Sequence, residues 1–374
     1  MVMKRILWIC VAMIFLWACK KEAKNNVIVD PLSSTFNLNY IDNVLFTNDN
    51  GTLIAGVYHH KYTLIKTNNN FNIVWSKNNY EWGDLISGSG WGSSFYSFQV
   101  AKMFQRTDGS YVCIGTVMEG GDVVYSTTLV IELNSKGEQV SKHEFKDLST
   151  SNALQTSDAG YILFGTQLVK LDAKFNQQWV KNVKDNLYSP IQIISTTNGG
   201  FAMTGSYKSD QPFLKKLDAN GNEILNTTYK HNAFPFNENG TDLVQLQDNG
   251  FLIIGRTRNL NQLTDLDCQI IRTDFKGDTL WTKRFGNSTN EWLDRIVSSD
   301  QNEFVIQGTS GFPNEIQKSI LLKINLDGQI LDSCRVDKFP MMLYSPLKNY
   351  VKVQSIDTAH INFFVVYQDK LFVK

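Results

Sequence analysis

The sequence predicts an all-β fold made of similar four-stranded units arranged around one axis. A turn followed by a short apolar strand recurs six times, a second hairpin follows each copy, and no stretch of the mature chain has helical periodicity. The glycines that close the first element lie at positions 56, 115, 165, 205, 255 and 308, so their intervals run from 40 to 59 residues. Four strands in a repeat of this length are typical of a β-propeller blade.

The first repeated element is a tight turn followed by a strand, seen in full from Asp248 to Gly255. Its relatives begin at Asp49, Asp108, Asp158, Asn198 and, more loosely, Gln301. Asp or Asn bonds the backbone of its own turn, and the following glycine tolerates positive φ. Each copy therefore joins two antiparallel strands.

The second repeated element is a strand, a turn and another strand, seen from Leu168 to Trp179. Its other copies begin at positions 64, 130, 214, 270 and 321. The turn centre is a glycine in four copies, at 137, 221, 277 and 328, whereas Phe71 and Phe175 replace it in the other two. Each complete repeat thus supplies four strands.

The end of the chain carries a degenerate seventh copy with three strands, Tyr350 to Ile356, Phe363 to Tyr367 and Leu371 to Val373. Val27 to Val29 precedes the first complete blade and is expected to supply the missing strand, which leaves no exposed sheet edge. We therefore predict one domain over residues 27–374, a propeller of seven four-stranded blades closed by both termini.

Residues 1–18 have the pattern of a secretory signal, with Lys4 and Arg5 followed by an apolar run too short for a comfortable membrane span. The sequence Leu-Trp-Ala-Cys that ends at Cys19 resembles the bacterial lipobox, which implies lipid attachment at Cys19; a plain signal peptide is the alternative. Residues 19–26 are polar and suit a tether. No acidic residue follows Cys19, so the resemblance favours the outer membrane, on either its periplasmic or its surface side.

Charge and cysteine content exclude two classes of protein. The chain has 36 basic and 36 acidic residues, and the loss of Lys4 and Arg5 with the signal leaves an acidic excess, which excludes a nucleic-acid partner. Apart from Cys10 and Cys19, the chain has three cysteines far apart, Cys113, Cys268 and Cys334, so we expect no disulfide framework. Cys113 lies in an apolar run and is expected to be a buried thiol.

The repeat resembles the bacterial secreted β-propeller repeats, often called seven-bladed, that are common on envelope lipoproteins of Bacteroidetes-like bacteria. The resemblance covers residues 40–335 and rests on the Asp-Gly-Gly-aromatic turn, the strand ending in Gly-Thr or Gly-Ser, the Leu-x-Lys-Leu-Asp-x-x-Gly-Asn hairpin, and the run from Phe285 to Ser288. It implies the fold and little about activity, because such repeats serve many roles.

A weaker similarity is to quinoprotein-type repeats, since a tryptophan recurs at the start of the fourth strand in three copies. The sequence has no adjacent cysteine pair to stack on a quinone. We therefore interpret Trp75, Trp179 and Trp281 as packing between blades and expect no cofactor.

Binding is expected at one end of the ring. The connections from second to third strand and from one blade to the next emerge together and are long and irregular, whereas the repeated turns at the other end are short. Proline supports this division, because Pro190, Pro212, Pro235, Pro313, Pro340 and Pro346 fall in the irregular connections and outside predicted strands. The same end carries aromatic residues suited to sugars or peptide side chains, although they also suit packing of the loops onto the blades. The candidate binding residues are Trp82, Trp91, Tyr96, Phe236, Trp292 and Tyr344.

No catalytic motif names a reaction, and no histidine has a partner at metal-ligand spacing. Two function classes remain open. The first is a monomeric, non-enzymatic envelope module that binds a protein or a glycan and is attached to the membrane by its lipid. The second is a polysaccharide lyase or hydrolase with acidic residues near the axis; clustering of His59, Asp122, Asp265 and Glu315 in one central pocket would favour it.

Overall fold

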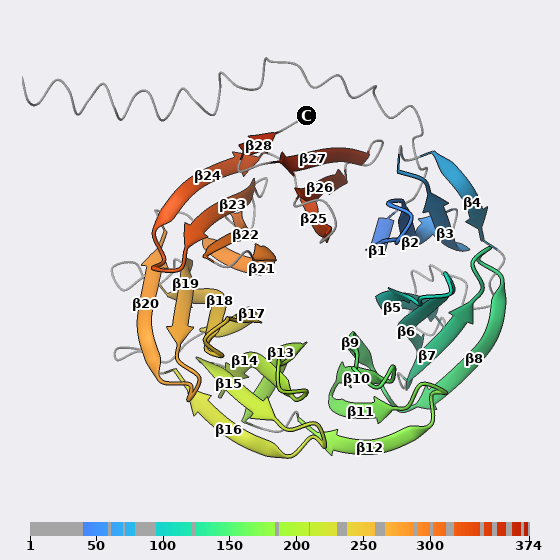
Figure 1. Cartoon of the computed structure of the whole chain (residues 1–374), viewed down its shortest axis with the longest axis horizontal. Coiled ribbons are helices and arrows are strands. Elements are labelled where there is room, and N and C mark those ends of the chain that lie inside the picture. Colours follow the sequence, from blue (N-terminus) through green and yellow to red (C-terminus); the bar gives the residue numbers. More distant parts are fainter. Residues whose placement is uncertain are drawn as a thin grey trace, which may run out of the picture.

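The computed structural model contains seven four-stranded sheets, each built from strands consecutive in the sequence, arranged around one axis (Figure 1). Neighbouring strands within every sheet are antiparallel. Each sheet is one blade, numbered 1 to 7 along the chain. The first strand of a blade is innermost and the fourth is outermost (Figure 1). The structure describes residues 40–58, 61–69, 72–78, 95–120, 125–183, 187–208, 210–229, 238–258, 266–286, 290–299, 302–311, 318–336, 340–345, 350–356, 361–367 and 370–372.

The strands of blades 1 to 4 are β1 (Tyr40–Phe46), β2 (Thr52–Tyr58), β3 (Lys61–Thr67) and β4 (Ile73–Lys77); β5 (Phe95–Gln105), β6 (Tyr111–Gly120), β7 (Tyr125–Leu133) and β8 (Gln139–Lys146); β9 (Thr150–Gln155), β10 (Tyr161–Gly165), β11 (Gln167–Leu171) and β12 (Gln177–Asn182); β13 (Tyr188–Ser195), β14 (Phe201–Tyr207), β15 (Gln211–Leu217) and β16 (Glu223–Thr228). Those of blades 5 to 7 are β17 (Asn239–Gln245), β18 (Phe251–Arg258), β19 (Leu266–Thr273) and β20 (Thr279–Phe285); β21 (Glu291–Ser299), β22 (Glu303–Ser310), β23 (Lys318–Asn325) and β24 (Ile330–Val336); β25 (Pro340–Ser345), β26 (Tyr350–Ile356), β27 (Ile361–Tyr367) and β28 (Lys370–Phe372). Among these described residues there is no helix with the length and hydropathy needed to cross a bilayer.

Blade 7 differs from its prediction, because all four of its strands come from the C-terminal segment. β25 occupies the innermost position that we had assigned to Val27 to Val29, and those residues lie outside the described part of the chain. β25 pairs with β26 from Pro340 opposite Ser355 to Ser345 opposite Tyr350. The predicted closure by both termini was wrong since Pro340, the first residue of this short segment, and Pro346, just after it, made it look like a connection.

The blades pack face to face through their middle strands. In β6, Tyr111 and Cys113 belong to the core between blades 1 and 2, whereas Val112 and Ile114 belong to the core between blades 2 and 3. The same alternation produces the cores between blades 3 and 4, 4 and 5, and 5 and 6. A strand buried on both faces needs apolar residues at every position, which explains the short apolar runs of the repeat.

The blade 7 position is enclosed by apolar residues of its two neighbours. In blade 1, Ile54 and Ile65 are buried on the face opposite to the core that blade 1 shares with blade 2. In blade 6, Val305 and Leu321 are buried on the face opposite to the core shared with blade 5. Both faces turn toward β25 to β28 (Figure 1). The burial of these four side chains is consistent with a seventh blade that fills the remaining sector of the ring.

The recurring tryptophans pack between blades, as predicted. A Cβ added to Gly137 in blade 2 would lie 2.6 Å from the ring of Trp75 in blade 1. The equivalent distance to the Trp179 ring is 2.9 Å at Gly221. Each ring therefore rests directly on the backbone of a glycine in the next blade. Trp281 repeats the arrangement on the corresponding turn of blade 6.

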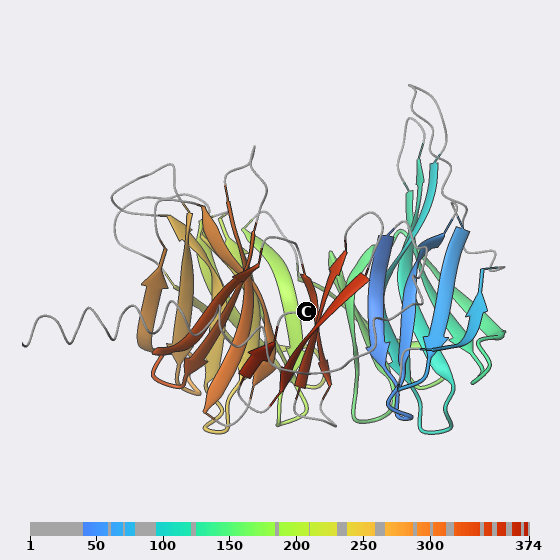
Figure 2. The same ribbon diagram turned by 90° about the horizontal axis from the view of Figure 1, so that it is seen from above.

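The two ends of the ring differ (Figure 2). We call the end with the short β1–β2 and β3–β4 type turns the turn end, and the end with the longer connections the loop end.

The predicted exclusion of proline from strands was wrong for Pro190 in β13, Pro212 in β15 and Pro340 in β25. Pro190 lies at a bulge on the innermost strand, where a missing N–H breaks no ladder bond. The carbonyl of Pro212 accepts a hydrogen bond from the backbone N–H of Tyr229 at 2.8 Å.

Candidate functional site

The three candidate aromatic residues that the structure describes do not share one end of the ring. Trp82, Trp91 and Phe236 lie outside the described residues. The other three lie in strands, Tyr96 in β5, Trp292 in β21 and Tyr344 in β25, because strand pairing extends further than the apolar pattern indicated. Tyr96 and Trp292 are near the beginning of innermost strands and so at the loop end. Tyr344 precedes the turn to β26, which places it at the turn end and corrects its assignment to the irregular face.

The residues proposed for catalysis, His59, Asp122, Asp265 and Glu315, all lie outside the described part of the chain, as does the lipid-attachment candidate Cys19. Within the residues that are described, no group of three or more His, Cys, Asp or Glu side chains is arranged to hold a metal ion.

The expectation for Cys113 is confirmed. Cys113 and Cys268 are buried, and neither forms a disulfide. Burial raises the pKa of Cys113 to about 12, so its thiol stays protonated and unreactive at neutral pH.

A feature that the sequence did not reveal is a β-bulge at the same level of six innermost strands. In each strand one residue pairs with the glycine that closes the repeat, and the next residue is the extra one, which has no pairing partner. The residue after it pairs with the position just before that glycine. The residues that follow the bulge are Asn43, Lys102, Asn152, Gln192, Asp242 and Arg295. We call these six residues the axial ring.

The bulge explains why the repeat needs its closing glycine. A Cβ on Gly165 would lie 1.8 Å from the carbonyl oxygen of Ser149, and one on Gly255 would lie 1.9 Å from that of Asn239. No side chain fits where the bulged strand approaches so closely. The repeat that identifies the fold is thus the same feature that places the axial ring.

Four members of the axial ring connect consecutive blades. Asn43 donates from Nδ2 to the carbonyl of Ala101 in blade 2 at 3.1 Å. Asn152 donates to Oε1 of Gln192 in blade 4 at 2.5 Å, and Gln192 in turn bonds Asp242 in blade 5. Asp242 accepts from the backbone N–H of Ile296 in blade 6 at 2.8 Å. These contacts link blades 1 to 2 and 3 to 6 near the axis.

Asp242 is the most buried charge of the ring, with 7% of its surface exposed. Burial raises the pKa of its carboxyl group, and the N–H groups of Ile296 and Leu243, the Gln192 amide and the positive charge of Arg295 partly counter that rise. Its Oδ1 accepts from Leu243 at 2.8 Å and its Oδ2 from Ile296. The carboxyl group therefore has its hydrogen bonds supplied by the fold.

Lys102 and Arg295 behave differently from the other four. Both side chains keep accessible surface on innermost strands, although protein atoms surround Lys102 closely enough to desolvate it, and neither makes a hydrogen bond or an ion pair with a described residue. Desolvation lowers the pKa of Lys102, the Arg295 charge lowers it further, and Asp242 raises it. The two cations therefore influence each other and Asp242 although they come from blades 2 and 6.

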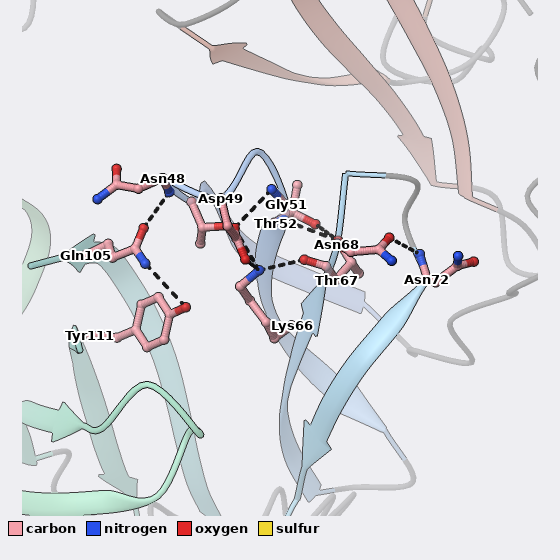
Figure 3. Close-up of polar contacts among 11 residues, drawn as sticks. Asn48, Asp49, Gly51, Thr52, Lys66, Thr67, Asn68, Asn72, Gln105 and Tyr111 are labelled. Carbon is pink, nitrogen blue, oxygen red and sulfur yellow. Dashed lines mark hydrogen bonds and ion pairs between the residues drawn. The ribbon is translucent and has the colours of Figure 1, made fainter. Parts of the chain in front are cut away.

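Polar side chains at the turn end bond the turns of the blades, and Gln105 of blade 2 also accepts from the backbone N–H of Asn48 in blade 1 at 2.7 Å (Figure 3). Lys66 of β3 is buried, and its Nζ donates to Asp49 Oδ2 at 2.7 Å and to the carbonyl of Thr67 at 2.6 Å. Lys170 and Asp158 repeat the pair at 2.8 Å in blade 3. Arg272 and Asp248 form it in blade 5. The basic residue of the Leu-x-Lys-Leu-Asp pattern thus anchors the Asp-x-Gly turn, a pairing that sequence reasoning missed.

The loop end contains buried polar side chains with atoms that make no hydrogen bond to any described residue. Glu238, before β17, is buried; its Oε1 accepts from Thr257 Oγ1 at 2.5 Å and lies 3.4 Å from a guanidinium nitrogen of Arg284. Seven buried side-chain atoms have no hydrogen-bond partner among the described residues, and six of them are at the loop end. They are Ser206 Oγ, Asp210 Oδ1, Glu238 Oε2, Asn239 Oδ1, Arg256 Nε and Arg284 Nε, with Tyr161 Oη alone at the turn end.

Comparison with known proteins shows the fold. No protein-family model and no curated protein matches the sequence. Among solved structures, the Dos1 propeller matches with a TM-score of 0.52 and 10% identity over 89% of this chain and 83% of that one. A protein from Lactobacillus plantarum matches with a TM-score of 0.52 and 10% identity over 90% and 95% of the two chains. BBS1N, solved in complex with ARL6DN, matches with a TM-score of 0.52 and 8% identity over 90% and 94%. At such identities the likeness concerns architecture alone, and it agrees with the strand arrangement: the predicted all-β propeller is confirmed.

Proposed function

We propose that this chain is a lipid-anchored envelope propeller that binds a protein or glycan partner through the loop end of its ring, without catalysing a reaction. The lipobox-like sequence at Cys19 and the likeness to secreted propeller repeats support the location. One structural observation supports the use of the loop end, the unequal bonding of buried polar groups at the two ends.

A buried polar atom without a partner destabilises a fold by about 1 to 3 kcal/mol, so such atoms need a reason to persist. At the turn end the repeated Lys–Asp and Arg–Asp pairs bond these groups inside blades 1, 3 and 5. At the loop end Glu238 Oε2 and Arg284 Nε lack such partners among the described residues. Groups of this kind are suited to bonds with a bound molecule, and propeller connections are where binding residues concentrate.

The loop-end proposal is tested by site-specific photocrosslinking in the intact lipidated chain. A crosslinking amino acid replaces Lys208, an exposed residue between β14 and β15 at the loop end, and in a matched variant it replaces Lys174, an exposed residue of a turn-end hairpin. We expect the chain with the probe at position 208 to capture a defined envelope protein or glycan and the chain with the probe at position 174 not to. Equal capture from both positions, or none from position 208, contradicts the proposal.

The anchor is tested separately. Replacement of Cys19 by Ala should move the protein from the membrane fraction to the soluble periplasmic or extracellular fraction, because the thiol is the acceptor of the lipid. A Cys10→Ala chain is the matched control, since that cysteine lies within the apolar part of the signal. If the Cys19→Ala protein stays in the membrane fraction, the chain is held there by another means.

A further inference from the structure

The axial ring contains two cations at one level of the ring. Lys102 pairs with Ile114, the residue before the closing Gly115, and Arg295 pairs with Gln307, the residue before the closing Gly308. Because both follow the same bulge, they have equivalent heights along the axis, in blades 2 and 6. Their exposure on innermost strands means that solvent reaches the axis at this level.

The two cations do not link neighbouring blades as the other members of the axial ring do. Asn43, Asn152, Gln192 and Asp242 each form a hydrogen bond to the following blade. Lys102 makes no such bond to any described residue, and a lysine in this position adds a charge where asparagine or glutamine forms a bridge.

Two carboxyl groups interact with the cations, Asp242 with both and Asp294 with Arg295, and burial raises the pKa of each carboxyl group. Asp242 is held by the backbone N–H groups of Leu243 and Ile296 and by Gln192, and it is 7% exposed, whereas the two cations are exposed to the axis. Lys102 and Arg295 also repel each other through space. Two like charges that act on each other on innermost strands raise the local concentration of anions.

We propose that Lys102 and Arg295 form an oxyanion-binding site on the propeller axis, one that takes a carboxylate or phosphate group of a small ligand. The guanidinium of Arg295 presents paired donors that match two oxygens of such a group, and the ammonium of Lys102 supplies a point charge from the opposite side of the ring. This site goes beyond the loop-end function and does not depend on it.

The experiment measures ligand binding by the full mature chain. Isothermal titration is carried out with inorganic phosphate, with galacturonate and, as the uncharged comparison, with galactose. The variants are Lys102→Gln and Arg295→Gln, which give each position a side chain already found in the ring at Gln192. Lys136→Gln is the matched control, because Lys136 is an exposed lysine of the same blade at the turn end.

We expect phosphate or galacturonate to bind the unaltered chain and galactose not to. Binding of galacturonate alone identifies an acidic sugar as the ligand class, and binding of phosphate alone identifies a phosphorylated one. Each axial variant should weaken the binding of the anion at least about tenfold, the effect of one lost charge-assisted bond, while Lys136→Gln leaves it unchanged.

A second readout separates this site from a structural role. Removal of either cation relieves like-charge repulsion and also removes an attraction to Asp242, so both axial variants should melt near the temperature of the unaltered chain in the absence of anions. The proposal is overturned if neither anion binds the unaltered chain, if galactose binds equally well, or if Lys136→Gln weakens binding as much as Lys102→Gln. A marked fall in the melting temperature of both axial variants also overturns it. None of these results bears on the crosslinking experiment at the loop end.

Discussion

A tryptophan and a glycine from successive blades occur as a pair, and blade 3 shows what happens when the pair is lost. Blade 2 has Ser141 where blades 1, 3 and 5 have tryptophan, and the facing turn of blade 3 has Phe175 in place of glycine. The Phe175 ring fills the space, with centroid distances of 4.9 Å to His143 and 5.4 Å to Tyr161. Phe175 keeps the left-handed φ of the turn, 65°. Burial of its ring therefore outweighs a backbone conformation that costs a non-glycine residue about 1 to 2 kcal/mol.

Replacement of Gly221 by Ala tests this pairing. Gly221 has a φ of 75°, and its added Cβ would lie 2.9 Å from the Trp179 ring. Gly199 is the matched control, with a φ of 81° and no heavy atom within 4 Å of the added Cβ. We expect Gly199→Ala to reduce the free energy of unfolding by about 1 kcal/mol through backbone strain alone, and Gly221→Ala to reduce it by about 2 to 4 kcal/mol because the indole must also move. Equal losses of unfolding free energy in the two variants, measured by urea unfolding, would show that the Trp179 ring moves aside at little energetic cost.

The turn-end ion pairs predict how stability depends on pH. Hydrogen bonds from Lys170 and Thr156 lower the pKa of Asp158 from 3.8 to about 2. A carboxyl group with a lowered pKa in the folded state stabilises the fold at pH values above its unfolded pKa, and that contribution is lost as the pH falls from about 4 to 2. Asp158→Asn should therefore cost about 1 kcal/mol at pH 7, a small value because the carboxylate is 62% exposed, and almost nothing at pH 2. Urea unfolding at pH 7, 4 and 2 measures the difference, with Asp278→Asn at another turn as the control; a deficit that does not shrink in acid contradicts the assignment.

The innermost strand of each blade is the one whose structure is hardest to predict from the sequence. The repeated turns, the closing glycines and the two hairpins per blade are local patterns, so most of the strands in blades 1 to 6 could be predicted from them. A bulge shifts the alternation of side chains by one residue without changing the composition, so nothing in the sequence revealed that Lys102 and Arg295 occupy equivalent positions. The position of Tyr344 was missed for another reason, because β25 is short, begins at Pro340 and is followed by Pro346.

The bridges of the axial ring are tested by Gln192→Leu. This change removes the acceptor of Asn152 and one donor to the buried Asp242, so two links between blades are lost together. We expect a loss of about 1 to 3 kcal/mol in the free energy of unfolding, since polar partners are left unsatisfied in a protein-walled space. Gln167→Leu is the control, because Gln167 bonds Asn182 within blade 3 in an exposed position. A loss at Gln192 no greater than that at Gln167 would mean that the blades hold together by their apolar faces alone.

The ring as a whole depends on how its last sector is filled. Blades 1 to 6 share five apolar cores, and blade 7 must cover the two faces left over. Because blade 7 comes entirely from the C-terminal segment, its innermost strand is β25, and its last strand, β28, is the outermost one. The chain end therefore matters less for closure than it would if both termini shared a blade.

Two truncations measure how much the last strand alone, and blade 7 as a whole, contribute to closure of the ring. Deletion of residues 370–374 removes only β28, and we expect it to lower the free energy of unfolding by less than about 2 kcal/mol. Deletion of residues 337–374 removes blade 7 and exposes Ile54 and Ile65 of blade 1 together with Val305 and Leu321 of blade 6, all now buried. At about 1.5 to 3 kcal/mol for each buried side chain, the loss is roughly 6 to 12 kcal/mol, comparable to the whole stability of a typical domain. The longer truncation should therefore fail to give a folded monomer, either unfolding or associating through the two exposed faces, as judged by thermal unfolding and size-exclusion chromatography. A chain ending at residue 336 that remains monomeric and melts near the temperature of the intact protein would mean that six blades close the ring among themselves, and that blade 7 covers neither face.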